Sequence, residues 1–237
     1  QMGLAVGGAT GEMDKISAWR FINPPASFTR GILVNRQGKR LCNEMYYGAK
    51  IGELMCTDES NTEAFLFIDK SLWKSTHRDC LPDQSNWTQW SLALMNLYLN
   101  SRWGRDIEHL AVRVGVNGKA LRKTLEEYNR IAEQGGEGDP LGKPPEGIRK
   151  LEPPFVAIDV SVGSKLFPCA TLTMGGLVVN EATGEVRRED GSEIKGLYAA
   201  GRTAVGVCSS GYMSGLAITD CIFSGRRAIR HALGGKR

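Results

Sequence analysis

Residues 196–227 read GLYAAGRTAVGVCSSGYMSGLAITDCIFSGRR, and this stretch decides the fold. A short apolar run, Leu197 to Ala200, leads into a loop rich in glycine and serine, and the loop opens a patterned helix near Ser214–Leu216. The unpaired backbone N–H groups at the positive end of a helix dipole favour a phosphate, a carboxylate or the electron-rich edge of a flavin. The loop also holds Tyr212, which a simple anion site does not need, so we expect chemistry here.

Together with two stretches upstream, this residue order resembles the FAD-dependent fumarate reductase and 3-ketosteroid dehydrogenase superfamily. Residues 171–186, TLTMGGLVVNEATGEV, resemble the strand pair before the last helix of that superfamily. Residues 31–44, GILVNRQGKRLCNE, resemble the hairpin where its substrate-capping domain begins. Three motifs in the family's order cover most of the chain, which makes the set more specific than any one motif. The resemblance implies FAD as the cofactor.

The resemblance also implies which residues contact FAD. In the superfamily, the N–H groups at the start of the last helix lie against the flavin pyrimidine edge, and the preceding strand end meets the pyrophosphate and ribitol. The cofactor-binding residues implied here are Gly201, Arg202, Ser214, Gly215, Leu216 and Ala217. Arg202 stands where the family usually has a glutamate, so its contact with FAD departs from the family pattern.

The residue at position 212 separates two substrate classes within the superfamily. Fumarate reductases place an arginine there, in a pattern like GGxHGxNRLGG, and a histidine beside TMGG. This chain reads VGVCSSGYMSG over that span and has Thr171 and Leu172 in place of the histidine. Because both cationic anchors are replaced, a dicarboxylate such as fumarate or succinate is disfavoured. The Tyr-x-Ser of Tyr212 and Ser214 is similar instead to the 3-ketosteroid Δ4-(5α)-dehydrogenases.

That similarity implies a desaturation of a steroid ring next to a ketone. Tyr212, with Ser214 as a possible relay, would remove a proton alpha to the C3 carbonyl, and a hydride would leave the adjacent carbon for flavin N5. A second catalytic tyrosine follows the Asn-Glu pair of the hairpin in those enzymes. Tyr47 matches it best and Tyr46 is the alternative; this tyrosine would polarise the ketone together with a backbone N–H.

Structural roles compete with these catalytic ones. Tyr212 could simply pack against a core edge, and Ser214 could be the N-cap of the last helix. Arg40 and Glu44 could form a buried pair that orients Tyr47, or an exposed cross-strand pair, and we expect the exposed pair. Other functions stay open as well: a Δ1-type or other cyclic-ketone dehydrogenase, a fumarate-reductase-like flavoprotein, or a truncated chain without activity.

Composition and charge exclude several other classes of protein. The net charge of +4 comes from 30 basic and 26 acidic residues, dispersed except near the C-terminus, so we expect no nucleic-acid partner. No apolar stretch is long enough to span a membrane, and no signal peptide is visible. Six scattered cysteines without a CxxC pair argue against a metal site and a disulfide framework, and favour a reducing, cytoplasmic location.

The predicted fold is α/β with an α+β capping domain, forming the C-terminal part of a two-domain FAD-binding flavoprotein. We expect residues 1–30 to end the FAD-binding domain, 31–165 to form the inserted substrate-capping domain, and 166–237 to return to the FAD-binding domain. The chain begins as if within a helix and has no GxGxxG after an opening strand. We therefore expect the N-terminal nucleotide-binding half to be missing, and to act as a partner.

Local patterns predict the individual elements. The signals are breaks at glycine and proline, alternation of apolar and polar residues, and apolar residues at helical spacing. They predict a helix up to about residue 20, a hairpin at 31–44, a buried strand at 64–69, helices at 87–103 and 117–133, a Pro/Gly-rich linker at 134–154, and strands at 156–162 and 172–179. The tryptophan-rich region 73–103 would be a hydrophobic lid over a steroid, although core packing is the expectation for most of its tryptophans.

Overall fold

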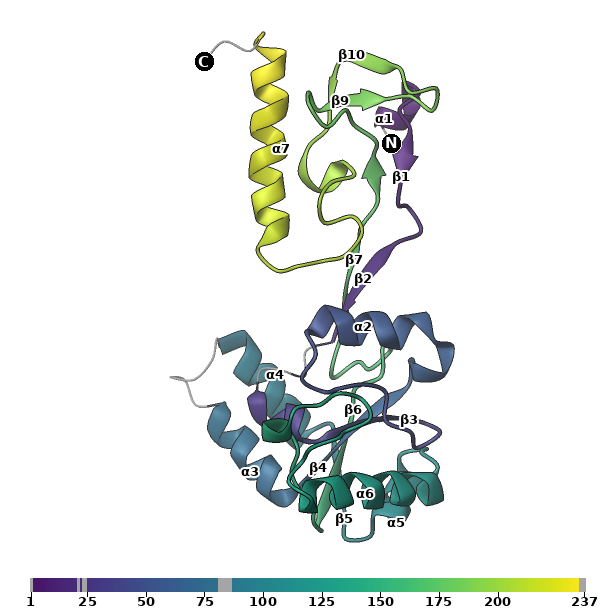
Figure 1. Ribbon diagram of the computed structural model, residues 1–237, viewed down its shortest axis with the longest axis vertical. Helices are drawn as coiled ribbons and strands as arrows, with labels where there is room; N and C mark the ends of the chain where they lie inside the picture. The colour runs from purple at the N-terminus through teal and green to yellow at the C-terminus, as the bar shows by residue number, and fades with distance from the viewer. Residues whose placement is uncertain (1, 21, 23–24, 81–86, 235–237) are drawn as a thin grey trace. The chain divides into compact units, whose positions relative to one another are not determined.

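The structure is a computed structural model that describes residues 2–20, 22, 25–80 and 87–234 (Figure 1). The chain forms two compact units, which are described separately. The smaller unit contains Gln1–Ser17 and Thr171–Arg237, and the larger unit contains Ala18–Ala170. Both mix helices and strands, which confirms the mixed α/β character of the fold. The correspondence of these units to a FAD-binding domain and a capping domain stays a prediction.

An antiparallel sheet forms the centre of the larger unit. Its strand order is β3-β4-β6-β5, with bounds Ile32–Asn35, Ala64–Asp69, Phe155–Asp159 and Ser101–Gly104. All six residues of β4 are buried, as the predicted strand at 64–69 requires. Leu66 lies opposite Leu33 on one neighbour and opposite Ile158 on the other. Apolar residues from both faces of this sheet enter one continuous core.

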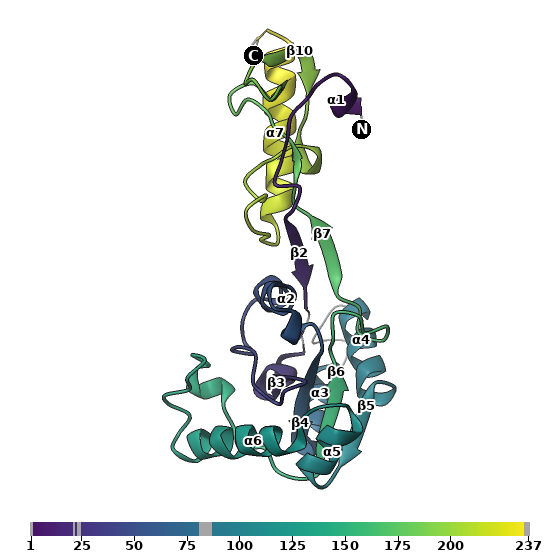
Figure 2. The ribbon, with the colours of Figure 1, turned by 90° about the vertical axis from the view of Figure 1, so that its right-hand side faces the viewer.

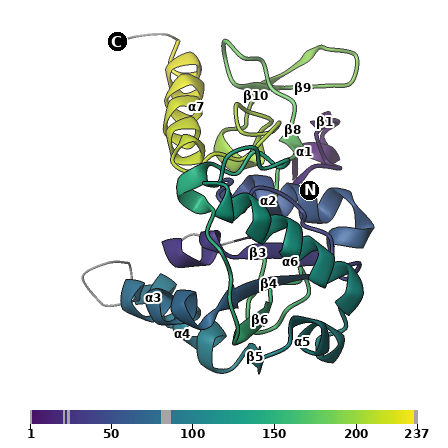
Figure 3. The same ribbon diagram turned by 60° about the horizontal axis from the view of Figure 1, so that its bottom comes forward.

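The helices of the larger unit pack around this sheet (Figure 3). They are α2 Gly48–Thr57, α3 Lys70–Asp79, α4 Trp87–Tyr98, α5 Ile107–Arg113 and α6 Gly118–Glu133. Helix α6 confirms the prediction for 117–133. The Asn117 side chain accepts a hydrogen bond from the Ala120 N–H at its start. Gly136 donates to the Ile131 carbonyl at its end, where both closing glycines have positive φ.

The smaller unit is built from short strand pairs and one long helix. Its elements are α1 Met2–Ala5, β1 Thr10–Gly11, β8 Gly176–Leu177, β9 Glu185–Arg187, β10 Glu193–Tyr198 and α7 Leu216–Ala232. Strand β1 pairs with β8 and β9 with β10, both antiparallel. Strands β2, Ile16–Trp19, and β7, Ala170–Thr173, pair with each other and carry the chain between the units (Figure 2).

The helix predicted up to residue 20 is wrong. Helix α1 ends at Ala5, and two short strands follow it. Gly7 has a φ of +83°, and the N–H of Gly8 bonds back to the Gly3 carbonyl, so the glycines close the helix after one turn. The small and apolar composition of this stretch is compatible with a helix, but its glycines act as the stop signal.

Three other predictions need their limits corrected. The hairpin turn at 31–44 is present, but its return arm pairs with β3 through a single bridge, Val34 to Arg40. The helix predicted for 87–103 ends at Tyr98, because Trp103 joins β5 and lies opposite Val156 in the sheet. The strand at 172–179 breaks at Gly175, whose backbone lies against the Glu12 carbonyl. The lid suggested for 73–103 falls partly on residues 81–86, outside the described residues.

Candidate active site

Helix α7 begins where the sequence places it, after the glycine- and serine-rich loop. Its N-cap is Gly215, with a φ of +86°, and the Thr219 N–H donates to the Gly215 carbonyl at 3.1 Å. The first helical residues are therefore Leu216 and Ala217, whose N–H groups belong to the orphan donors of a helix start. The N-cap role considered for Ser214 is wrong, because Gly215 occupies that position and supplies a backbone conformation that serine rarely adopts.

Tyr212 and Ser214 lie in the last turn before this helix. The Tyr212 side chain is partly buried, whereas Ser214 and Gly215 are exposed. The structure thus brings Tyr212, Ser214, Leu216 and Ala217 together within a few residues of the positive end of a 17-residue helix. A site of this kind suits an electron-rich group next to a phenol hydroxyl.

Gly201 and Arg202 occupy a short 3₁₀ turn, Gly201–Thr203, that follows β10. The Gly201 N–H donates to Ser224 Oγ of α7 at 2.8 Å, and its φ is +58°. A Cβ there would press on Cys221, so glycine lets this turn approach the helix closely. The turn borders two cavities within the smaller unit, of 390 Å³ on the Gly201 side and 360 Å³ on the Arg202 side.

Tyr47 belongs to the larger unit, at the N-cap position of α2. Its carbonyl accepts hydrogen bonds from the Lys50 and Ile51 N–H groups at 2.8 and 3.1 Å. Tyr47 is 45% exposed, and its ring contacts the Trp19 ring edge to face, with centroids 4.5 Å apart. Tyr46 is similarly exposed, at 41%, so exposure does not separate the two candidates. Tyr47 is distinguished by its place at the start of α2 and by its ring contact with Trp19.

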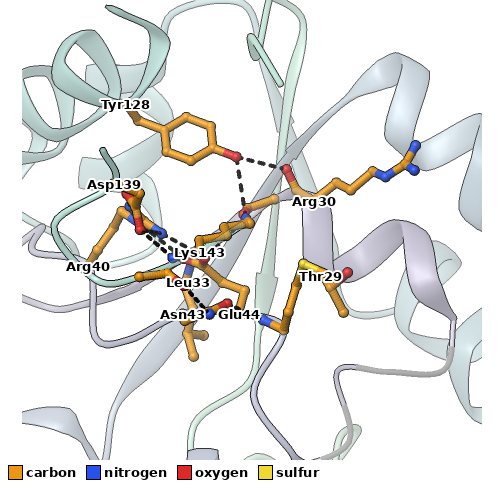
Figure 4. A network of polar contacts seen from close by, with 12 residues as sticks. Thr29, Arg30, Leu33, Arg40, Asn43, Glu44, Tyr128, Asp139 and Lys143 are labelled. Atoms are coloured by element: carbon orange, nitrogen blue, oxygen red, sulfur yellow. Dashed lines mark hydrogen bonds and ion pairs between the residues drawn. The ribbon is translucent and has the colours of Figure 1, made fainter. Parts of the chain in front are cut away.

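Arg40 and Glu44 are part of a buried ionic cluster, not the exposed pair that we expected (Figure 4). The cluster consists of Arg40, Glu44, Asp139 and Lys143. Their side chains are at most 7% exposed. Arg40 contacts Glu44 at 2.8 Å and Asp139 at 2.5 Å, and Lys143 Nζ contacts Glu44 at 3.0 Å. The prediction of an exposed pair is wrong, because the return arm of the hairpin turns inward and residues 139–143 cover it.

Burial and charge compensation act against each other in this cluster. Burial lowers the pKa of the Lys143 ammonium, and the charge of Glu44 opposes that shift. Burial also lowers the pKa of the Arg40 guanidinium, but the hydrogen bonds and charges of Glu44 and Asp139 outweigh it and raise the pKa overall. Two cations thus face two anions at close range, which is how a protein interior tolerates charge.

Asp139 and Lys143 were not predicted as site residues, because the Pro/Gly-rich pattern of 134–154 predicts a linker. That segment contains a 3₁₀ turn, Pro145–Gly147, but Lys143 is fully buried and also donates to the Gly31 carbonyl at 2.8 Å. The segment therefore belongs to the core of the larger unit. The available signal was the pair of opposite charges four residues apart in the sequence GDPLGK, at positions 138–143.

Among the residues that the structure describes, no three His, Cys, Asp or Glu side chains are grouped so as to hold a metal ion. Within the described ranges, no helix combines the length and apolar character needed to cross a membrane.

Residues 15–215 match the family model described as FAD binding domain, and the chain belongs to this family of FAD-binding flavoproteins. It is 37% identical over 203 residues to a 3-oxo-5-alpha-steroid 4-dehydrogenase of Comamonas testosteroni, which covers 85% of this chain and 38% of that relative. It is 30% identical over 200 residues to a fumarate reductase (cytochrome) of Shewanella frigidimarina, covering 83% of this chain and 31% of that relative. The chain thus spans less than half of the length of these relatives.

The fold is similar to that of a 3-ketosteroid-Δ4-(5α)-dehydrogenase from Rhodococcus jostii RHA1, solved in complex with 4-androstene-3,17-dione. The TM-score is 0.80 at 32% identity, covering 100% of this chain and 44% of that chain. A 3-ketosteroid Δ1-dehydrogenase from Sterolibacterium denitrificans shares the fold at a TM-score of 0.69 and 22% identity, covering 99% of this chain and 46% of that one. The resemblance predicted from three motifs is confirmed, and so is FAD as the cofactor of the family.

The residues present fit a flavin. The start of α7 offers orphan N–H groups, and Gly215 leaves the approach to them without a Cβ. Gly201, Arg202, Ser214, Gly215, Leu216 and Ala217 stay the predicted FAD contacts.

Proposed function

We propose that the protein is an FAD-dependent dehydrogenase that desaturates the ring of a 3-keto steroid. The observation that carries this proposal is Tyr-x-Ser, at Tyr212 and Ser214, at the start of α7 in a chain 37% identical to a 3-oxo-5-alpha-steroid 4-dehydrogenase. A neighbour in structure is a dehydrogenase of 3-ketosteroids solved with a steroid bound, which supports the same substrate class.

Each tyrosine has one proposed task. Tyr212 accepts the proton that leaves the carbon alpha to the ketone, and the positive end of α7 stabilises the phenolate that does so. Ser214, two residues along, passes that proton on. Tyr47 donates a hydrogen bond to the ketone oxygen and stabilises the negative charge that develops there. When bound, FAD supplies the hydride acceptor, so the two C–H bonds broken yield one C=C bond, a proton and a reduced flavin.

The nearest alternatives catalyse the same kind of desaturation, at another ring position or on another cyclic ketone. A Δ1-type ketosteroid dehydrogenase, or a dehydrogenase of another cyclic ketone, would use the same tyrosines. A fumarate-reductase-like activity is disfavoured, because Tyr212 stands where that group has an arginine, and Thr171 and Leu172 stand in place of its histidine. Flavin reduction by saturated 3-keto steroids and not by succinate separates the ketone dehydrogenases from a fumarate-reductase-like enzyme, and the position of the double bond in the product separates the Δ4 and Δ1 types.

We propose the domain roles on similar grounds. The larger unit, which holds Tyr47, would be the substrate-capping domain, expected over 31–165. The smaller unit, with 1–30 and 166–237 expected, would belong to the FAD-binding domain. Ile218, Ile222 and Phe223 on α7 are 58–68% exposed, and this apolar face supports a further part of a FAD-binding domain as its partner. All six cysteines are free thiols, which supports a cytoplasmic location.

Replacing the proposed base tests the function. Tyr212→Phe removes the hydroxyl and keeps the ring, so turnover of a 3-keto steroid should fall by about 10²- to 10⁴-fold with FAD content unchanged. Tyr98→Phe is the matched control, because Tyr98 is exposed on α4 and packs against Trp73. Steady-state kinetics with flavin quantification measures both. Near-normal rates in Tyr212→Phe would return Tyr212 to a packing role.

A further inference from the structure

The segment between the hairpin and α2 is fastened to the loop at 139–147. Asn43 Nδ2 donates to the Gly142 carbonyl at 2.8 Å. Glu44 pairs with Lys143, and Met45 lies so close to Gly147 that a Cβ there would overlap its sulfur. Three successive residues thus each contact the same loop, although about a hundred residues of sequence separate the two segments.

Glu44 is the centre of this attachment (Figure 4). One carboxylate oxygen accepts from the Leu33 N–H of β3 at 2.9 Å and from Arg40 Nε at 3.1 Å. The other accepts from Arg40 at 2.8 Å and lies 3.0 Å from Lys143 Nζ. Asp139 in turn fixes both cations. Its carboxylate pairs with the Arg40 guanidinium and also accepts a hydrogen bond from the backbone N–H of Lys143 at 3.0 Å. The carboxylate therefore has one well-defined position, set from strand and loop together.

Tyr47 stands three residues beyond Glu44. Its carbonyl starts α2, and its ring rests on Trp19. Three residues span at most about 11 Å, so the position of Glu44 limits where the tyrosine can lie. The intervening residues are also held, since the Met45 N–H donates to Asn43 Oδ1 at 2.9 Å and the Tyr46 N–H to the Asn43 carbonyl at 3.1 Å.

We propose that Arg40, Glu44, Asp139 and Lys143 are positioning residues that hold Tyr47 where it can meet the substrate ketone. This inference rests on the proposed function for the role of Tyr47. A buried ion pair is often no more stabilising than apolar residues of the same volume, and its best-attested use is to select one arrangement among several. The cluster fixes the backbone conformation of residues 43–47, because it connects this segment to β3 and to the loop at 139–147.

The first test measures position without activity. Lys143→Met keeps the side-chain length and removes the charge that joins Glu44 to the loop. Hydrogen exchange in the Lys50 and Ile51 amides, which bond to the Tyr47 carbonyl, should become at least about 10-fold faster. Lys150→Met is the matched control, because Lys150 is half exposed and pairs with Glu133 on the surface. Unchanged exchange in Lys143→Met would overturn the inference.

The second test links position to chemistry through a double-mutant cycle. On the FAD-bound protein, Lys143→Met should lower kcat for a 3-keto steroid by about 10-fold or more, and Lys150→Met by less than about twofold. In a Tyr47→Phe background, Lys143→Met should add less than about twofold, because the group it positions is gone. Equal effects in both backgrounds would overturn the inference and leave the proposed function standing.

The outcomes distinguish the two claims. If Tyr47→Phe alone keeps full activity, the proposed role of Tyr47 fails, and the exchange data decide the positioning by themselves. If Lys143→Met does not fold, Asp139→Asn replaces it: this change keeps the shape of the side chain and removes one of the two anions that fix Arg40. The same faster exchange and the same loss of additivity are expected.

Discussion

At the scale of the residue, Cys42 reports how strongly the larger unit excludes water. It is 3% exposed, and burial, assisted by the charge of Glu44, raises the pKa of its thiol from 9.0 to about 12. Burial likewise raises the pKa of the Cys80 thiol to about 11. Both groups stay protonated in the folded chain at a pH where the unfolded chain has lost the proton.

This difference predicts alkaline destabilisation. The folded pKa lies above the unfolded one, so the stabilising contribution is complete below pH 9 and is lost as the pH rises toward 12. Each such thiol changes the free energy of unfolding by at most about 1.4 kcal/mol per pH unit within that window. Urea unfolding measures the free energy of unfolding at pH 8 and at pH 10.5. The decrease between these pH values should be smaller in Cys42→Ala than in the unsubstituted protein.

The control for the thiol is Cys221→Ala, a change at an exposed cysteine on α7. The prediction fails if Cys42→Ala and Cys221→Ala lose the same stability between the two pH values. Such a result would mean that the alkaline loss comes from other groups.

At the scale of the element, the packing of α2 depends on one glycine. A Cβ on Gly52 would overlap the Ala18 carbonyl oxygen, so the helix lies directly against the backbone of β2. Gly52→Ala should therefore destabilise the protein by about 2–3 kcal/mol, because the helix has to move out of its place. The gain in helix propensity, about 1 kcal/mol, offsets only part of that.

The same substitution elsewhere provides the control. Gly225 lies in the interior of α7, and a Cβ there would meet nothing within 4 Å. Gly225→Ala should raise the free energy of unfolding by about 0.5–1 kcal/mol. Equilibrium urea unfolding measures both variants. Equal effects at the two glycines would contradict the close contact between α2 and β2.

Elements with local signals were predictable, and those made by distant contacts were not. Helix α6 carries its own N-cap, apolar face and glycine stop, so its limits followed from sequence. Strand β5 exists because residues 101–104 pair with β6, about fifty positions away, and nothing local distinguishes them from the helix before them. Lys143 was missed for the same reason: its partner Glu44 is distant in sequence.

In the candidate site, too, the local features were predictable from the sequence and the long-range contacts were not. The glycine loop and the start of α7 are continuous in sequence, so Tyr212, Ser214 and the predicted FAD contacts could be named from it. The surroundings of Tyr47 could not, because Trp19 comes from β2 and the ionic cluster joins residues about a hundred positions apart. Sequence named the side chains, whereas the fold was needed to find what holds them.

At the scale of the whole molecule, the chain is a member of a family of FAD-binding flavoproteins and spans 38% of the length of its 3-oxo-5-alpha-steroid 4-dehydrogenase relative. The same family includes fumarate reductases at 30% identity. Overall similarity therefore identifies the cofactor of the family but not the substrate. We expect the substrate class to depend on the residue at position 212. In the proposed function, the phenol at position 212 removes a proton from the carbon next to a ketone, whereas a guanidinium there would bind a carboxylate.

Anaerobic titration of the FAD-bound protein tests this choice most directly. The flavin absorption band is followed while saturated 3-keto steroids are added in one series and succinate in another. A 3-keto steroid should bleach the flavin, and succinate should leave it oxidised. Reduction by succinate, with no response to any steroid of the panel, would contradict the proposed substrate class.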